Sequence, residues 1–214
     1  MVKLLFLSLM FSTQCAIAQD LVLVFLHHRA DKAELPKAQL DKIMEGHQAN
    51  IRLMANQGKL LVAGPFEGGG GIFIFNSASV EEVNQWLATD PGVRAERWKV
   101  EIQPYHWRTG KPRLVKAPLE MTTYNFVRFI PYIAKFNIND APELLKKHDD
   151  YLKEIGMTGN VVAEGTFGDT EGGILVVKGI LDASVIESDP AVREGLLEIE
   201  IKKWYVAKGA FSEK

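Results

Sequence analysis

The sequence predicts an α+β protein made of two ferredoxin-like βαββαβ units joined in one chain. Three observations support this prediction. Several blocks of sequence recur in the same order about 100 residues apart, each copy alternates short apolar runs with amphipathic helical segments, and a segment with prolines separates the copies. Two helices cover one face of the sheet in such a unit, so packing of the two open sheet faces would make the chain an intramolecular pseudo-dimer.

The repeat is clearest in the segments GKLLVAGPF and GNVVAEGTF, which begin at Gly58 and Gly159. His47 and His148 lie upstream of them at the same spacing of 101 residues. Downstream, GGIFIF matches GGILVV and TDPGVR matches SDPAVR, at spacings of 102 and 99 residues. Spacings that change only in loops or at element ends are typical of a duplication with small insertions and deletions.

The first copy supplies each element of the βαββαβ order in turn. An apolar run predicts a buried strand, and a helix with apolar residues at spacings of three and four follows until Gly58 stops it. Two short apolar strands come next, joined by a Gly-rich hairpin, then a helix capped by Ser79 and a final alternating strand. The predicted strands are Leu21 to Leu26, Leu60 to Ala63, Gly71 to Phe75 and Lys99 to Trp107.

The second copy repeats this pattern and ends in LEIEIKKW, where apolar residues alternate with charges. We therefore place the units at 20–107 and 122–209. The segment 108–121 has two prolines, four basic residues and no periodic apolar face, which is typical of a linker. Trp98, Trp107 and Trp204 lie at or near the final strands, and we expect them to pack between the copies.

The first residues predict a secretory signal peptide at 1–18. Lys3 gives a basic start, an apolar stretch follows, and Ala16-Ile17-Ala18 fits the small-x-small pattern before a cleavage site. Lipidation at Cys15 is the less favoured alternative, because the residues before it are polar. Cleavage after Ala18 removes the only cysteine and predicts a periplasmic or secreted protein.

Composition argues against several classes of partner. The formal net charge is −2 with mixed signs, so we expect no nucleic-acid binding, and no second apolar run is long enough for a membrane after signal cleavage.

His27 and His28 point to opposite faces of a strand, which argues against a shared metal ion. The glycines from Gly68 to Gly71 lack a following GK[ST], so we expect a hairpin rather than a phosphate loop, and we expect no cofactor.

Two histidines and two aspartates occupy positions where apolar core residues are expected. His47 and His148 each lie four residues from an apolar residue on both sides along a predicted helix. Asp90 and Asp189 follow the apolar stripe of the second helix, and we expect both to point inward from its last turn. Buried polar groups need partners, so the simplest arrangement has each His face the Asp of its own copy.

Such a pair has a chemical use. The carboxylate accepts the proton of one ring nitrogen and fixes the tautomer, which leaves the other nitrogen as a general base. The alternative is structural, because a His on an apolar face is often a satisfied core residue and an Asp before Pro often ends a helix. The presence of both residues in both copies keeps the functional and the structural interpretation open.

These residues together resemble the YCII-related family, small ferredoxin-like proteins of the dimeric α+β barrel group. The resemblance depends on the helical His47, the GKLLVAGP strand and turn, the helix ending in Asp90-Pro91, and the last strand with Val100 and Ile102. It covers nearly all of the first copy and, more weakly, the second. It implies that His47 with Asp90, and His148 with Asp189, are active-site pairs in an intramolecular dimeric α+β barrel.

Some relatives in that family act as dehydrochlorinases or resemble muconolactone-isomerase-type enzymes, so the resemblance implies lyase- or isomerase-type chemistry on a small molecule. We expect elimination, isomerisation or hydrolysis, with Gly64, Pro65 and Gly165 at the ligand. A non-catalytic ligand-binding or structural module is the alternative. We expect a monomer that forms the pseudo-dimer by itself, or a higher homo-oligomer.

Overall fold

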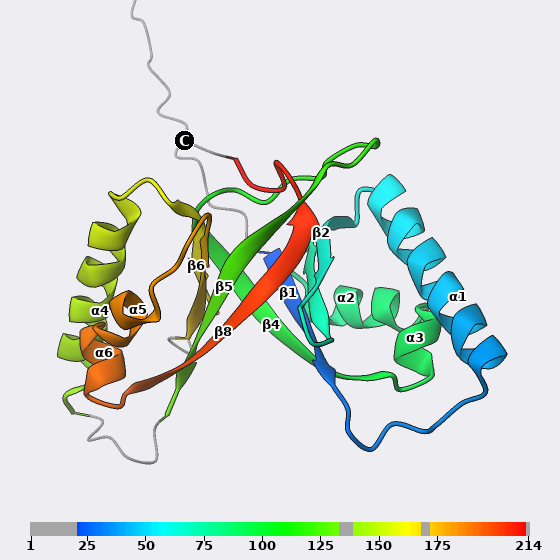
Figure 1. Cartoon of the computed structure of the whole chain (residues 1–214), viewed down its shortest axis with the longest axis horizontal. Helices are drawn as coiled ribbons and strands as arrows, with labels where there is room; N and C mark the ends of the chain where they lie inside the picture. Colours follow the sequence, from blue (N-terminus) through cyan, green and yellow to red (C-terminus); the bar gives the residue numbers. More distant parts are fainter. Residues whose placement is uncertain (1–20, 133–138, 168–171, 213–214) are drawn as a thin grey trace, which may run out of the picture.

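The computed structural model describes residues 21–132, 139–167 and 172–212, and two units with the same order of elements occupy them (Figure 1). The first unit consists of β1 (Leu21–His28), α1 (Lys37–Asn56), β2 (Leu60–Pro65), β3 (Gly71–Phe75), α2 (Val80–Leu87), α3 (Pro91–Arg94) and β4 (Trp98–Thr109). The second consists of β5 (Met121–Pro131), α4 (Ala141–Gly156), β6 (Val161–Thr166), β7 (Gly173–Val177), α5 (Ala183–Glu187), α6 (Pro190–Arg193) and β8 (Leu197–Ala207).

The predicted α+β fold is confirmed, with a four-residue helix, α3 or α6, added after the second helix of each unit. The predicted signal peptide at 1–18 lies outside the described residues.

The eight strands form one sheet in the order β2-β3-β1-β4-β6-β7-β5-β8. The units meet where β4 pairs with β6, with His106 opposite Thr166 and Thr109 opposite Glu164. The two outer strands approach each other through an isolated bridge between Phe66 and Trp204, so the sheet closes into a barrel. Figure 1 shows the helices on the two outer sides of this barrel. Because β4 ends at Thr109, it continues two residues into the segment 108–121 that was predicted as a linker.

The protein has three apolar cores, and the alternating side chains of strand β1 contribute to two of them. Its odd-numbered residues from Leu21 to Phe25 point into the barrel, where they join a core drawn from both units. Its even-numbered residues from Val22 to Leu26 pack under the helices of the first unit. A third core lies between the sheet and the helices of the second unit. The prediction that this apolar run is a buried strand is confirmed.

Local signals in the sequence place the helix boundaries. α1 ends at Asn56, and Gly58 follows with a positive φ of 70°, a conformation that glycine adopts without steric cost. Ser79 caps α2, because its side-chain oxygen accepts a hydrogen bond from the N–H of Glu82 at 3.1 Å. Both predictions are confirmed.

Two of the three tryptophans pack as expected. Trp204 is fully buried in the core shared by the two units, and Trp107 packs against the same core. The prediction for Trp98 is wrong: its ring lies 4.7 Å from the ring of His47, under the helices of the first unit. Trp98 is the first residue of β4 and belongs to the face of that strand that the helices cover.

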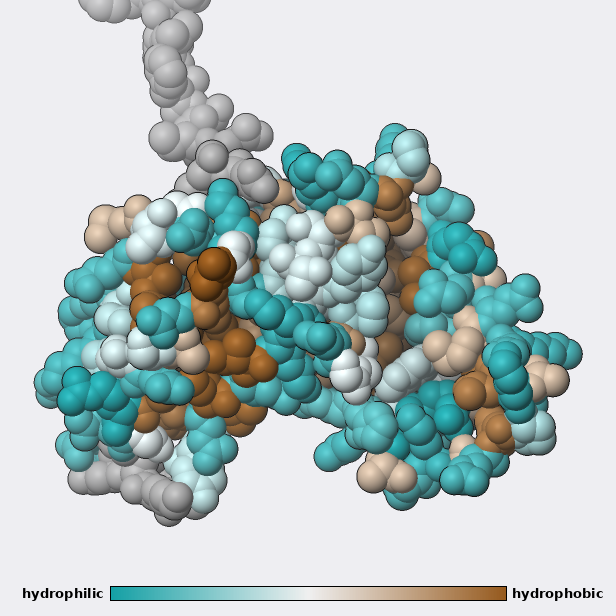
Figure 2. All heavy atoms as spheres, viewed as in Figure 1, coloured by the Kyte–Doolittle hydropathy of each residue, from teal (hydrophilic) through white to brown (hydrophobic). Residues whose placement is uncertain are grey.

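The surface is mixed in character. Figure 2 shows a mainly hydrophilic face with an apolar patch in the second unit. Ile180, in the segment between β7 and α5, is 97% exposed. In the described part of the chain, no helix has the length and apolar character that crossing a membrane requires.

Candidate functional site

A buried histidine and a buried aspartate are hydrogen-bonded in the first unit. His47 comes from α1, and Asp90 lies just before α3. The Nδ1 atom of His47 is 3.0 Å from Oδ1 and 2.9 Å from Oδ2 of Asp90. His47 is 5% exposed and Asp90 is fully buried. The structure therefore brings together the two residues that the spacing of the sequence places on the inside.

The prediction that Asp90 ends the second helix is wrong in one respect. α2 ends at Leu87, and Asp90 is the N-cap of α3, where its Oδ1 accepts hydrogen bonds from the N–H groups of Gly92 and Val93 at 2.8 and 3.0 Å. Pro91 then occupies the start of α3, where the missing N–H has no helical partner to lose. The spacing from Leu87 places Asp90 inward although the chain between them is not helical.

The carboxyl group of Asp90 stays ionised at neutral pH. Burial by itself raises its pKa, but the hydrogen bond and charge of His47, the N–H of Val93 and the side-chain amide of Asn50 outweigh this effect. The pKa of Asp90 therefore lies below its ordinary value of 3.8. An ionised Asp90 accepts a hydrogen bond from the N–H at His47 Nδ1 and so fixes the tautomer of the imidazole.

The second unit repeats the pair. His148 Nδ1 on α4 is 2.6 Å from Oδ2 of Asp189, and the two residues are 7% and 1% exposed. Asp189 is the N-cap of α6, with its Oδ1 accepting from the N–H of Ala191 at 2.8 Å. As in the first unit, one carboxylate holds an imidazole and caps a short helix at the same time.

In both pairs the free nitrogen of the imidazole is Nε2. Within the described residues, no hydrogen bond involves Nε2 of His47 or His148. Fully buried side-chain atoms without a partner in the same part of the chain are Tyr105 Oη, Trp107 Nε1 and Arg128 Nε. The two Nε2 atoms are not among these buried atoms. An imidazole with its proton on Nδ1 presents a lone pair at Nε2.

The two pairs differ in what covers them. Trp98 stacks close to His47, and Gly92 makes room for it, because a Cβ at Gly92 would lie only 2.8 Å from Cη2 of that ring. The second unit has Ala191 and Leu197 at the matching positions. The glycine and the large ring of the first unit are thus exchanged together for an alanine and a smaller side chain.

This exchange predicts a coupled pair of substitutions. Gly92→Ala should lower the free energy of unfolding by about 1–2 kcal/mol, because the added Cβ collides with Trp98. Adding Trp98→Leu should recover part of that loss, as Ala191 and Leu197 coexist in the second unit. Urea unfolding of the single and double variants measures both effects. Costs that simply add, with no coupling between the two positions, would contradict this explanation.

A cavity of about 230 Å³ opens beside His148. Phe129, Leu145 and Leu152 form its apolar side. A larger cavity of about 500 Å³ adjoins it, and both are lined by Arg108, Asp149, Leu152 and Glu164. Together they offer the volume typical of a small-molecule site next to an imidazole.

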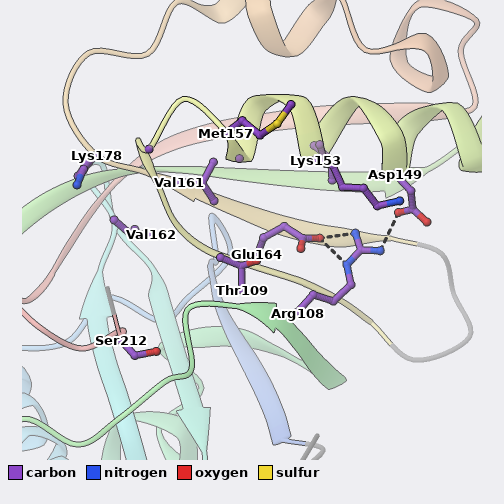
Figure 3. A pocket seen from close by; sticks show the side chains of 13 residues that line it. Arg108, Thr109, Asp149, Lys153, Met157, Val161, Val162, Glu164, Lys178 and Ser212 are labelled. Carbon is purple, nitrogen blue, oxygen red and sulfur yellow. Dashed lines mark hydrogen bonds and ion pairs between the residues drawn. The ribbon is translucent and has the colours of Figure 1, made fainter. Parts of the chain in front are cut away.

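Three charged side chains form a cluster at the junction of the two cavities (Figure 3). Arg108 donates from Nε to Glu164 Oε1 at 2.7 Å and from a terminal nitrogen to the same oxygen. Its other terminal nitrogen donates to Asp149 Oδ1 at 2.7 Å. Arg108 belongs to the last strand of the first unit, so this part of the cavity is built by both units. Arg108 lies in the segment predicted as a linker and was not among the predicted site residues.

The residues expected at the ligand lie in different surroundings. Gly165 lines the cavity beside His148, and a Cβ there would lie 2.5 Å from Tyr105 Cε2. The carbonyl of Gly64 accepts a hydrogen bond from Trp204 Nε1 at 3.1 Å, so this glycine lies against the other unit. Pro65 lines a separate cavity with Phe66 and Lys203. Close packing between the units accounts for both glycines.

A second polar cluster, which sequence reasoning missed, lies on the inner side of the barrel. Arg128 of β5 donates to Oε1 of Glu101 on β4 at 2.5 Å, and the Glu101 Oε2 is 2.6 Å from Nε2 of His27. The guanidinium also lies 4.1 Å from the centre of the Phe25 ring. The hydrogen bond to His27, together with those from Arg128 and Gln103, outweighs burial and holds the pKa of Glu101 well below its ordinary value.

No group of three or more His, Cys, Asp or Glu side chains is arranged to hold a metal ion within residues 21–132, 139–167 and 172–212. His27 contacts Glu101, whereas His28 lies near Lys32, at 3.4 Å.

Comparison with known proteins connects the first unit to a family. Residues 21–105 match the family model described as the YCII-related domain. A search among curated proteins returned no significant match to the chain. The matched segment contains His47 and Asp90 and ends within β4.

Three solved structures are similar over most of the chain. A protein of Fusobacterium nucleatum subsp. nucleatum assigned as a monooxygenase has 10% identity and a TM-score of 0.50, and the match covers 92% of this chain and 96% of that one. A protein of Lactobacillus acidophilus NCFM with the same assignment has 13% identity and a TM-score of 0.46, covering 91% and 98%. One assigned as a chlorite dismutase has 11% identity and a TM-score of 0.49, covering 89% and 96%. The likeness to the Fusobacterium protein concerns the fold alone.

Proposed function

We propose that this chain, whose first unit matches the YCII-related domain, is an exported enzyme that performs general acid/base chemistry on a small molecule. The observation that carries the proposal is the second His–Asp pair. His148 lines a cavity of about 230 Å³ while Asp189 holds its Nδ1 at 2.6 Å. This leaves Nε2 as the nitrogen that a ligand in the cavity meets.

The pair supplies the parts that a proton transfer needs. Nε2 of His148 accepts a proton from an acidic C–H or O–H of the ligand, and the carboxylate of Asp189 stabilises the imidazolium that forms. In an elimination, the electron pair of the broken C–H bond forms a double bond as the leaving group departs with its own pair. In an isomerisation, Nε2 returns the proton to another carbon, and in a hydrolysis it activates a water molecule.

The proposal includes the location and assembly of the chain. Residues 1–18 would act as the signal peptide and the mature protein would be periplasmic or secreted. The second unit would be a diverged copy of the first unit's domain, because it repeats the His–Asp pair on matching elements. The two units would act as a pseudo-dimer, alone or within a homo-oligomer.

A structural role for the pairs is the second candidate. It is favoured by the fact that Asp90 and Asp189 each cap a short helix as well as holding a histidine. Under this account, the ligand-binding properties of the protein would not depend on either histidine.

A thermal-shift screen of a small-molecule library separates the two candidates. The mature chain 19–214 is compared with its His148→Ala and His47→Ala variants. Compounds that stabilise the wild type should still raise the melting temperature of His47→Ala, but should lose about tenfold or more in affinity for His148→Ala. Compounds that stabilise all three proteins equally, with lower starting stability in both variants, would support the structural role instead.

A further inference from the structure

Arg108 belongs to the first unit but lines the cavities of the second. Its two carboxylate partners differ in exposure. The side chain of Glu164 is 11% exposed, whereas that of Asp149 is 42% exposed. Glu164 is therefore held in place by its surroundings, and Asp149 can turn into water at little cost.

The guanidinium is not saturated by these two partners. An arginine has five N–H donors, and three of them are used here, so two remain. Lys153 and Lys178 also line the larger cavity, and within the described residues Lys178 has no ion-pair partner. Figure 3 shows Lys178 at the other side of the cavity from Arg108. The lining thus carries more cationic groups than carboxylates.

Apart from the charged groups, Thr109 and Ser212, the larger cavity is lined by apolar side chains and glycines. Leu152, Met157, Val161 and Val162 contribute to its lining. A ligand that fits this combination has an apolar body and one anionic group. A cavity that only received water would not need an apolar lining next to an arginine with free donors.

We propose that Arg108 binds the carboxylate of a small apolar acid in the His148 site, with the ligand carboxylate taking the place of Asp149. The inference rests on the proposed function of that site and names its substrate class. Exchange of one carboxylate for another keeps the charge of Arg108 compensated, and planar pairing with a guanidinium gives the ligand a fixed orientation. The apolar body of the ligand then lies beside Leu152, a residue that both cavities share.

The first unit lacks this cluster. Gln48 and Ala63 of the first unit match Asp149 and Glu164, and Ala207, from the last strand of the second unit, matches Arg108. The chain therefore binds one acid, in the second unit, although it has two His–Asp pairs.

Isothermal titration of the mature chain with 3-phenylpropanoate and with neutral 3-phenylpropanamide tests the inference. The acid should bind with one site per chain and about tenfold or more tightly than the amide. Arg108→Gln should remove this preference. Asp149→Asn should raise the affinity for the acid about threefold or more, because the competing carboxylate is gone. Glu143→Gln, on the same helix, is the matched control and should leave the affinity unchanged, because this carboxylate pairs with Lys147 outside both cavities.

The gain expected for Asp149→Asn cannot arise from misfolding, so the inference stays testable even if Arg108→Gln is unstable. Equal binding of acid and amide, no gain in Asp149→Asn, or no binding of the acid overturns it. If acid and amide bind equally and both need His148, the inference fails and the proposed function stands. If the acid needs Arg108 but is indifferent to His148→Ala, the carboxylate site stands and the proposed function fails.

Discussion

Replacing Asp90 with alanine is expected to lower the free energy of unfolding by about 3–5 kcal/mol, because it removes one partner of a buried pair and a helix cap together. The variant leaves His47 Nδ1 and the side-chain amide of Asn50 without their acceptor. It also leaves the N–H groups of Gly92 and Val93 at the start of α3 unsatisfied. Urea unfolding monitored by tryptophan fluorescence measures the loss.

Two variants separate the pair from the cap. Asp182→Ala removes an exposed N-cap that accepts hydrogen bonds from Ser184, and should cost clearly less than Asp90→Ala. Asp90→Asn keeps an oxygen for the cap but loses the charge. Similar costs for Asp90→Ala and Asp182→Ala would mean that the contact with His47 contributes nothing.

The loss in Asp90→Asn should depend on pH. The pKa of Asp90 in the folded protein lies below 3.8, so its ionised form stabilises the fold at all higher pH values. That contribution disappears as the pH falls below 3.8 through the folded pKa. The difference in unfolding free energy between wild type and Asp90→Asn should therefore be large at pH 7 and shrink toward pH 2. A difference that stays constant over this range would contradict the stated pKa direction.

Replacing Glu101 with alanine is expected to cost about 2–3 kcal/mol, because it leaves the 9% exposed Arg128 without its carboxylate inside the barrel. This loss of stability is smaller than that for a fully buried pair, because the Glu101 side chain is 27% exposed. Glu101 belongs to the first unit and Arg128 to the second, so the loss reflects the joining of the units. Chemical unfolding of the variant provides the measurement.

The exposed pair of Lys146 and Asp150, four residues apart on α4, is the control. Lys146→Ala should leave the unfolding free energy nearly unchanged, because water screens an exposed pair. A loss in Glu101→Ala no larger than that control would show that the inner cluster does not hold the units together.

Features that depend on local periodicity could be predicted from the sequence. The strand at Leu21 to Leu26, the helix stop at Gly58 and the cap at Ser79 follow from patterns within a few residues. The meeting of His47 with Asp90 followed from two helical periodicities and the assumption that both helices cover one sheet face. Asp90 was predicted to lie in the last turn of α2 because its spacing from Leu87 fits a helix. It is instead the N-cap of the short helix α3.

Features that depend on contact between the units could not be predicted. Arg108 lies in the segment predicted as a linker, and it reaches the cavities of the second unit because β4 continues and pairs with β6 of that unit. Arg128 occupies a strand position that would be apolar by alternation alone, and its partner Glu101 lies on another unit's strand. Trp98 was assigned to the wrong core because the face of β4 that it occupies is set by sheet register.

The tautomer of His148 tests the central claim most directly, since the proposed chemistry requires an unprotonated Nε2. Long-range proton–nitrogen NMR correlation of the mature chain, with imidazole nitrogens labelled, reports the position of the proton on each ring. The account predicts that His148 at neutral pH carries its proton on Nδ1, and that Asp189→Asn abolishes this preference. A proton on Nε2 of His148 in the wild type, unaffected by Asp189→Asn, would contradict the account.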